Sequence, residues 1–153
     1  MRAAAAVLAL GATLASARPL RAQAADTAVV HVRGPVVVAC FERVEQARVD
    51  ADEDLATVMD DFAWHWSEAA RSLEAHGVAA ESRGSGWVKL ATRGDRLRLV
   101  RCPKPVGYVL AAPGRLPKVL AGVTADLDLL RAAAAYFRRP ELARKEDGDA
   151  GHR

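Results

Sequence analysis

Two kinds of hydrophobic pattern follow each other along the first half of the chain. The run from Val36 to Phe41 (VVVACF) is continuous and rich in valine, which is typical of a strand buried on both faces, as in α/β proteins. From about Asp54 to His76, apolar residues recur at three- and four-residue spacing, which predicts a helix with one buried face. Gly77 follows as a natural helix end.

Shorter apolar runs predict the other elements. We expect strands at Thr27–Val32 and Val78–Glu81, and two hairpins, Trp87–Thr92 with Arg96–Arg101 and Tyr108–Ala112 with Leu116–Val123. Arg93-Gly94-Asp95 is the turn of the first hairpin. A last helix, Ala125–Phe137, is expected to be capped by Thr124, with five residues facing inward: Leu127, Leu130, Ala133, Ala134 and Phe137. From Arg138 the chain is polar, which predicts a flexible tail over residues 138–153.

The N-terminal segment has the pattern of a secretory signal peptide. Arg2 precedes a short apolar run, and Ala22-Gln23-Ala24 offers small residues before a cleavage point. The run is shorter than the roughly 20 residues of a transmembrane helix. We therefore expect residues 1–24 to be removed, a single domain over 25–137, and export to the periplasm or beyond, with no transmembrane segment in the mature form.

Removal of that segment changes the charge of the chain. The sequence has 22 Lys and Arg against 19 Asp and Glu. Three of the basic residues and no acidic residue precede position 25, which leaves 19 of each sign. Because a nucleic-acid-binding protein is expected to retain a basic excess, nucleic acid is not an expected partner.

Charge is nevertheless unevenly distributed. Eight acidic residues lie between Glu42 and Asp61, and nine basic residues lie between Arg83 and Lys118. We expect two solvated surfaces that attract each other within the fold. The alternative is a basic face for an acidic partner or an anionic surface of the cell envelope.

The two cysteines, Cys40 and Cys102, are expected to form a structural disulfide, since an exported chain meets an oxidising compartment. Two free thiols or a redox-active pair are the alternatives. The sequence predicts no metal site and no cofactor: the acidic stretch Asp50–Asp61 lacks the glycine and the final glutamate of a calcium loop. His65, on a helix, has no partner histidine four residues later, so a packing or surface role is expected.

The order of elements resembles the thioredoxin fold. Val36–Ala47 (VVVACFERVEQA) resembles the family's central strand and the loop that carries its redox centre, and Pro105–Phe137 resembles its proline-led hairpin and closing helix. The resemblance implies an α/β (α+β) fold, with a central mixed sheet, a long helix after the first core strand and a closing C-terminal helix. It also implies a strand next to Cys40 that begins close to Cys102.

The chain departs from the family at the redox motif. Where the family has Cys-x-x-Cys at the start of its first helix, this chain has Glu45-Gln46-Ala47-Arg48, which contains no residue able to form a thiolate. The resemblance still implies a peptide-binding surface beside a cis-proline, of which Pro105 is the expected one. The seven candidate residues of this surface are Arg43, Val44, Glu45, Gln46, Lys104, Pro105 and Val106.

We therefore expect an exported, non-catalytic thioredoxin-like binding or accessory protein of a bacterial-type cell envelope, with an extended peptide or an envelope protein as its partner. One alternative is a thiol-disulfide enzyme that uses Cys40 and Cys102. Another is a small structural α+β domain unrelated to thioredoxin.

Overall fold

Strand β2 (Val36–Phe41) lies at the centre of the fold, as its continuous apolar run indicates. The computed structural model describes residues 27–94 and 97–144. β2 pairs in parallel with β3 (Ala79–Arg83) and antiparallel with β6 (Val106–Ala111). β6 also pairs antiparallel with β7 (Lys118–Ala121), which gives a mixed sheet in the order β3-β2-β6-β7.

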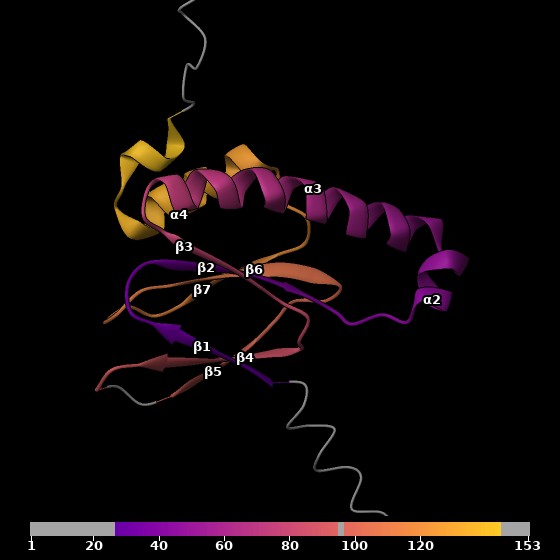
Figure 1. The fold of residues 1–153 in the computed structure, drawn as a ribbon, viewed down its shortest axis with the longest axis horizontal. Helices are drawn as coiled ribbons and strands as arrows, with labels where there is room; N and C mark the ends of the chain where they lie inside the picture. The colour runs from indigo at the N-terminus through magenta and orange to yellow at the C-terminus, as the bar shows by residue number, and fades with distance from the viewer. Residues whose placement is uncertain (1–26, 95–96, 145–153) are drawn as a thin grey trace, which may run out of the picture.

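A second, three-stranded sheet lies against the first. β4 (Trp87–Thr92) is its middle strand, parallel to β1 (Thr27–Val32) and antiparallel to β5 (Arg98–Arg101). In Figure 1 this sheet lies on one side of β2 and β6, and the helices lie on the other. The sequence predicted one central sheet, so the division of the strands between two sheets is a correction.

In the described part of the chain, two helices lie above the four-stranded sheet, α3 (Glu53–Ala75) and α4 (Asp126–Phe137), and the short helix α2 (Gln46–Ala51) precedes α3 beyond the end of the sheet (Figure 1). α3 confirms the helix predicted from the three- and four-residue spacing. At its start the Asp52 carboxylate accepts a hydrogen bond from the Leu55 amide at 3.0 Å, which satisfies one of the free N–H groups of the first turn. Gly77, with φ of 73°, lies just beyond its end.

The two faces of β2 belong to two hydrophobic cores. Val37 and Ala39 face the helices, where they pack with Phe62, Leu73 and Tyr108. The alternate residues of the same strand face the second sheet. This second core contains Val36, Val38, Cys40, Val30, Val88, Val100, Cys102 and Val109. A strand with a core on each side has no solvent-facing position, which explains why its sequence is apolar throughout.

Helix α4 differs from its prediction at its first turn. The N-cap residue is Ala125, not Thr124, and it makes no side-chain cap. Leu127, predicted to face inward, is 44% exposed, whereas Leu129 is fully buried. The other four predicted inward residues, Leu130, Ala133, Ala134 and Phe137, are buried.

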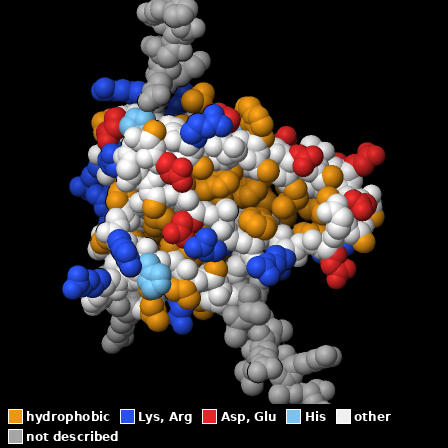
Figure 2. All heavy atoms as spheres, in the orientation of Figure 1, with side chains coloured by type: hydrophobic (Ala, Val, Ile, Leu, Met, Phe, Trp, Pro, Cys, Tyr) orange, Lys and Arg blue, Asp and Glu red, His pale blue; other side chains and the backbone are white. Residues whose placement is uncertain are grey.

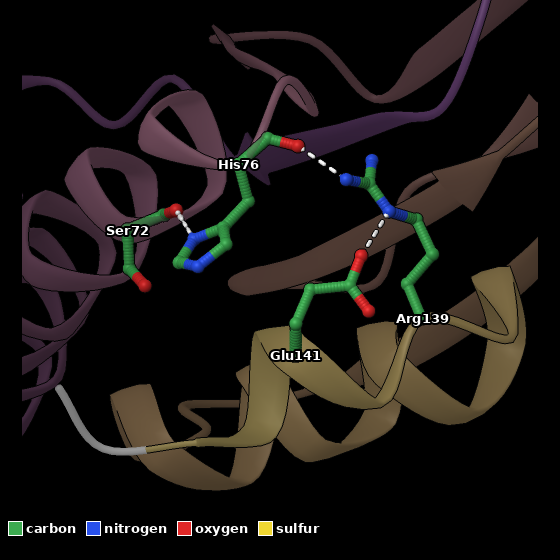
Figure 3. A network of polar contacts seen from close by, with 4 residues as sticks. All are labelled: Ser72, His76, Arg139 and Glu141. Carbon is green, nitrogen blue, oxygen red and sulfur yellow. Dashed lines mark hydrogen bonds and ion pairs between the residues drawn. The ribbon is translucent and has the colours of Figure 1, made fainter.

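The chain remains folded beyond residue 137, where the sequence predicted a tail. A 3-10 helix, η1 (Pro140–Ala143), follows α4 and places Leu142 in the core with no exposed surface. Arg139 holds this segment against the end of α3: its guanidinium donates to the His76 carbonyl at 2.6 Å and to the Glu141 carboxylate at 2.7 Å (Figure 3). His76 Nδ1 in turn lies 2.8 Å from the Ser72 carbonyl.

The expected signal peptide, most of the expected tail and part of the Arg93-Gly94-Asp95 turn lie outside the described residues. Among the helices of the described part, none is long and apolar enough to cross a membrane.

Candidate functional site

Cys40 and Cys102 form a disulfide, as the sequence predicted. Cys40 lies on the face of β2 that meets the second sheet, and Cys102 directly follows β5 of that sheet. The bridge thus connects the two sheets. The Cys102 amide donates to the Gly86 carbonyl at 3.0 Å, and both cysteines are almost completely buried.

The segments on either side of the bridge meet at one end of the fold. The Glu42 amide donates to the Pro105 carbonyl at 2.7 Å, which extends the pairing of β2 with β6 by one bond. The Lys104 ammonium lies 3.8 Å from the Glu42 carboxylate. The Lys104–Pro105 peptide bond is cis, as expected. These contacts fix the two loops that form the candidate surface.

A shallow pocket of about 200 Å³ lies between these loops. It is polar and carries both signs of charge, because Glu42, Arg43 and Lys104 line it. The rest of its wall comes from Pro103, Cys102 and two residues of the loop between β3 and β4, Ser85 and Gly86. We call it the loop pocket. Its size and charges suit part of an extended polar chain better than an apolar ligand.

Only some of the predicted surface residues lie at the loop pocket. Arg43 and Lys104 line it, and Pro105 adjoins it through its bond to Glu42. Glu45 and Gln46 begin α2, and the Gln46 side chain donates to Asp50 at 2.7 Å.

The prediction is wrong for Val106. This residue is fully buried, because it begins β6 with its side chain directed toward the helices. Val44 is half-buried and is not among the residues that line the loop pocket.

The loop between β3 and β4 is the part of the site that the sequence analysis missed. A Cβ built on Gly84 would lie 2.8 Å from the Phe41 ring and 3.1 Å from Arg43 Nε. Glycine is therefore needed for the loop to pass beneath these two side chains. Ser85 is buried, and its hydroxyl donates to the Trp87 carbonyl at 2.7 Å. Gly84-Ser85-Gly86 indicates a tight loop, but nothing local in it indicates which loops it contacts.

His65 has a structural role. Its Nδ1 lies 3.1 Å from the Asp126 carboxylate and 3.3 Å from the Asp126 amide, so it connects α3 to the first turn of α4. The position agrees with the packing role expected from the sequence. Across the described ranges, no three His, Cys, Asp or Glu side chains converge in a way that suits a metal ion.

Comparison of the chain with models of protein families, with curated proteins and with solved structures finds no match. The geometry of the molecule is therefore the basis for any statement about its function.

Proposed function

We propose that this chain is a non-catalytic, thioredoxin-like binding module that holds an extended peptide segment at the loop pocket. The observation that carries the proposal is the four-stranded sheet. Its order is β3-β2-β6-β7, with β2 and β3 parallel and the other pairs antiparallel. Two helices, one between β2 and β3 and one after β7, cover a single face. A mixed sheet, a long helix after its first core strand and a closing helix are features that the resemblance implies, and they support the thioredoxin-like part of the proposal.

A non-catalytic role follows from where the sulfur atoms lie. The start of α2, where the redox members of that family place their thiolate, has Glu45 as N-cap and Gln46 in its first turn. The only two cysteines of the chain form a buried bridge, and the nearer of them, Cys40, lies in β2, before the start of α2. Thiol-disulfide exchange needs an accessible thiolate, so these facts favour binding over the rival enzyme.

The character of the ligand follows from the surroundings of the pocket. Glu42, Arg43 and Lys104 provide polar contacts of both signs. Figure 2 shows an apolar area beneath α3, and Phe41, Val58 and Met59 are partly buried side chains of the helix-side core. An extended peptide with alternating polar and apolar residues could contact both regions. Export to the cell envelope, implied by the N-terminal segment, is part of the proposal.

The test is a peptide selection followed by a comparison of variants. Peptides selected from a random library on the wild-type protein are measured by calorimetry against an Arg43→Ser, Lys104→Ser variant. We expect binding to weaken about tenfold or more, because each lost charge-assisted hydrogen bond contributes about 1.5–3 kcal/mol. When peptide is added to the wild type, the changes in amide chemical shift should centre on residues 42–46, 84–86 and 102–105.

The matched control is Arg71→Ser, Arg131→Ser, which removes the same charge from the helices, where these side chains are 72% and 67% exposed. It should bind the peptides as the wild type does. Equal weakening of both variants, or a library that yields no binder, would contradict the proposal and favour a purely structural α+β domain.

A further inference from the structure

A second candidate site lies at the opposite end of the two sheets from the loop pocket. Val32 and Thr92 are paired partners at the carboxyl ends of the parallel strands β1 and β4. The residues that follow them, Arg33 and Arg93, therefore leave the sheet side by side. The loop pocket lies at the start of β4, beside Gly86. The two sites are thus separated by the length of a six-residue strand, about 17 Å.

Two more arginines approach the same place from other elements. Arg98 is the partner of Leu90 in the pairing of β5 with β4, so both side chains lie on the same face of the sheet, toward β6. Arg115 comes from the turn between β6 and β7. Its guanidinium donates to the Tyr136 carbonyl and lies 5.9 Å from the centre of the Tyr136 ring, which fixes its position.

These arginines surround two adjoining cavities. The narrower one, of about 210 Å³, is lined by Arg98 and Arg115 together with Gly114 and apolar side chains. The wider one, of about 740 Å³, is lined by Arg33 and Arg93 with His31 and Pro113. Val32 and Thr92 belong to both walls, so the cavities adjoin each other. We call them together the arginine cleft.

The positive charge of the arginine cleft is not neutralised within the described part of the chain. No acidic residue in ranges 27–94 and 97–144 lines either cavity. Arg33, Arg93 and Arg98 take part in none of the ion pairs formed between residues of these ranges. Figure 2 shows Lys and Arg side chains along this end of the molecule, where the turns after β1, β4 and β6 lie in Figure 1.

We infer that the arginine cleft binds a terminal phosphate or sulfate group. Guanidinium groups donate paired hydrogen bonds to such oxyanions, and four of them reach this cleft from three turns and one strand. Leu90, Ala111 and Ala112 form an apolar wall on the inner side, and charges beside apolar protein attract each other more strongly than charges in bulk water. The same chemistry occurs in a free phosphomonoester and in the head group of an acidic phospholipid.

The experiment uses inorganic phosphate as the probe for a free ligand, and vesicles of phosphatidylglycerol in phosphatidylcholine as the probe for a head group. Binding to the wild type is measured at low salt, by calorimetry for phosphate and by co-sedimentation for vesicles. Vesicles of phosphatidylcholine alone provide the background. The site variant is Arg33→Ser, Arg98→Ser, which removes one arginine from each cavity.

We expect the site variant to bind the effective probe about tenfold or more weakly than the wild type. The helix control Arg71→Ser, Arg131→Ser, of equal net charge, should bind as the wild type does. Circular dichroism and a thermal midpoint close to that of the wild type establish that each variant is folded. The pair Arg43→Ser, Lys104→Ser at the loop pocket should also leave this binding unchanged, which separates the two sites.

Phosphate binding that depends on Arg33 and Arg98 supports a soluble oxyanion as ligand, and vesicle binding alone, with the same dependence, supports the phospholipid head group. The inference is overturned if the wild type binds neither probe. It is equally overturned if the site variant and the helix control weaken binding to the same extent, since that result indicates an unspecific effect of net charge.

Discussion

Among the described residues, Tyr108 is the largest fully buried side chain, and its hydroxyl is the one buried side-chain oxygen or nitrogen without a hydrogen-bond partner. The ring packs against Phe62 and Trp66, with centroids 5.3 and 6.1 Å away. The hydroxyl makes no hydrogen bond to any residue that the structure describes. Burial raises the pKa of Tyr108 above its ordinary value of 10.0, and the nearby backbone of Thr124 opposes only part of this rise.

Replacement of Tyr108 by phenylalanine should therefore leave the free energy of unfolding unchanged or raise it by up to about 1 kcal/mol, because a buried hydroxyl without a partner opposes folding. Urea denaturation measures the change. Tyr108→Ala is the control for the ring, and its expected cost is about 3–5 kcal/mol. A loss above about 1.5 kcal/mol in Tyr108→Phe would indicate that the hydroxyl has a hydrogen bond in solution.

Single-residue predictions from the sequence succeeded within the body of an element and failed at its start. Cys40 lies in a valine-rich run, so its burial could be predicted, and its pairing with Cys102 was expected because an exported chain with two cysteines meets an oxidising compartment. Val106 is the first residue of β6, and Leu127 lies in the first turn of α4. Their exposure depends on how far the neighbouring layer extends, which is a property of the tertiary structure and leaves no signal in the local sequence.

At the scale of elements, η1 shows how a polar segment becomes part of the fold. Its residues Pro140–Ala143 include a single buried side chain, Leu142. The segment is held mainly by Arg139, which contacts both the end of α3 and Glu141 (Figure 3). The hydrogen bond from Arg139 lowers the pKa of Glu141 below its ordinary value of 4.5.

This shift predicts a pH-dependent attachment of η1. Because the pKa of Glu141 is lower in the folded state, its ionised form stabilises the fold above pH 4.5, and the contribution is lost as the pH falls below that value. The Leu142 amide donates to the Arg139 carbonyl at 3.1 Å. Its hydrogen exchange, relative to the intrinsic rate, should accelerate as the assay pH is lowered from above to below the ordinary Glu141 pKa value of 4.5.

Glu141→Gln is the matched control. It should exchange faster than the wild type at pH 6 and show no further loss of protection on acidification. If the wild type and the variant lost protection over the same pH range and to the same extent, the effect would belong to another carboxyl group.

The elements that repeat a clear period could be predicted from the sequence, and the others could not. α3 and the six-residue strands were predicted to within a few residues, because each has several consecutive positions that agree on one period. α2 has no buried residue and η1 has one, so neither has a face that a pattern could indicate. The arginine cleft also escaped prediction, since Arg93, Arg98 and Arg115 were considered only as part of a basic stretch and Arg33 lies outside that stretch.

At the scale of the whole molecule, the disulfide links the two β-sheets covalently. Cys40 belongs to the four-stranded sheet, and Cys102 follows the last strand of the three-stranded one. Their Cα atoms are 5.8 Å apart, and they are separated by 62 positions in the chain. A crosslink over so long a loop restricts the unfolded chain strongly.

A Cys40→Ala, Cys102→Ala variant should therefore lose about 2–5 kcal/mol of unfolding free energy, which urea denaturation can measure. Reductant should destabilise the wild type and leave the variant unchanged. Two thiols that react with an alkylating agent in the denatured, unreduced wild type would show that the bridge is not formed.

The separation of charge has a consequence for how the whole protein moves. Figure 2 shows acidic side chains gathered over α2 and the start of α3, and basic ones toward the end with the arginine cleft. A chain with 19 charges of each sign beyond residue 24 can thus be electrically neutral and still possess a large permanent dipole moment. Such a molecule hardly migrates in a uniform field but rotates in it. Near an anionic surface it would align with the arginine cleft inward, leaving the end with the loop pocket directed away.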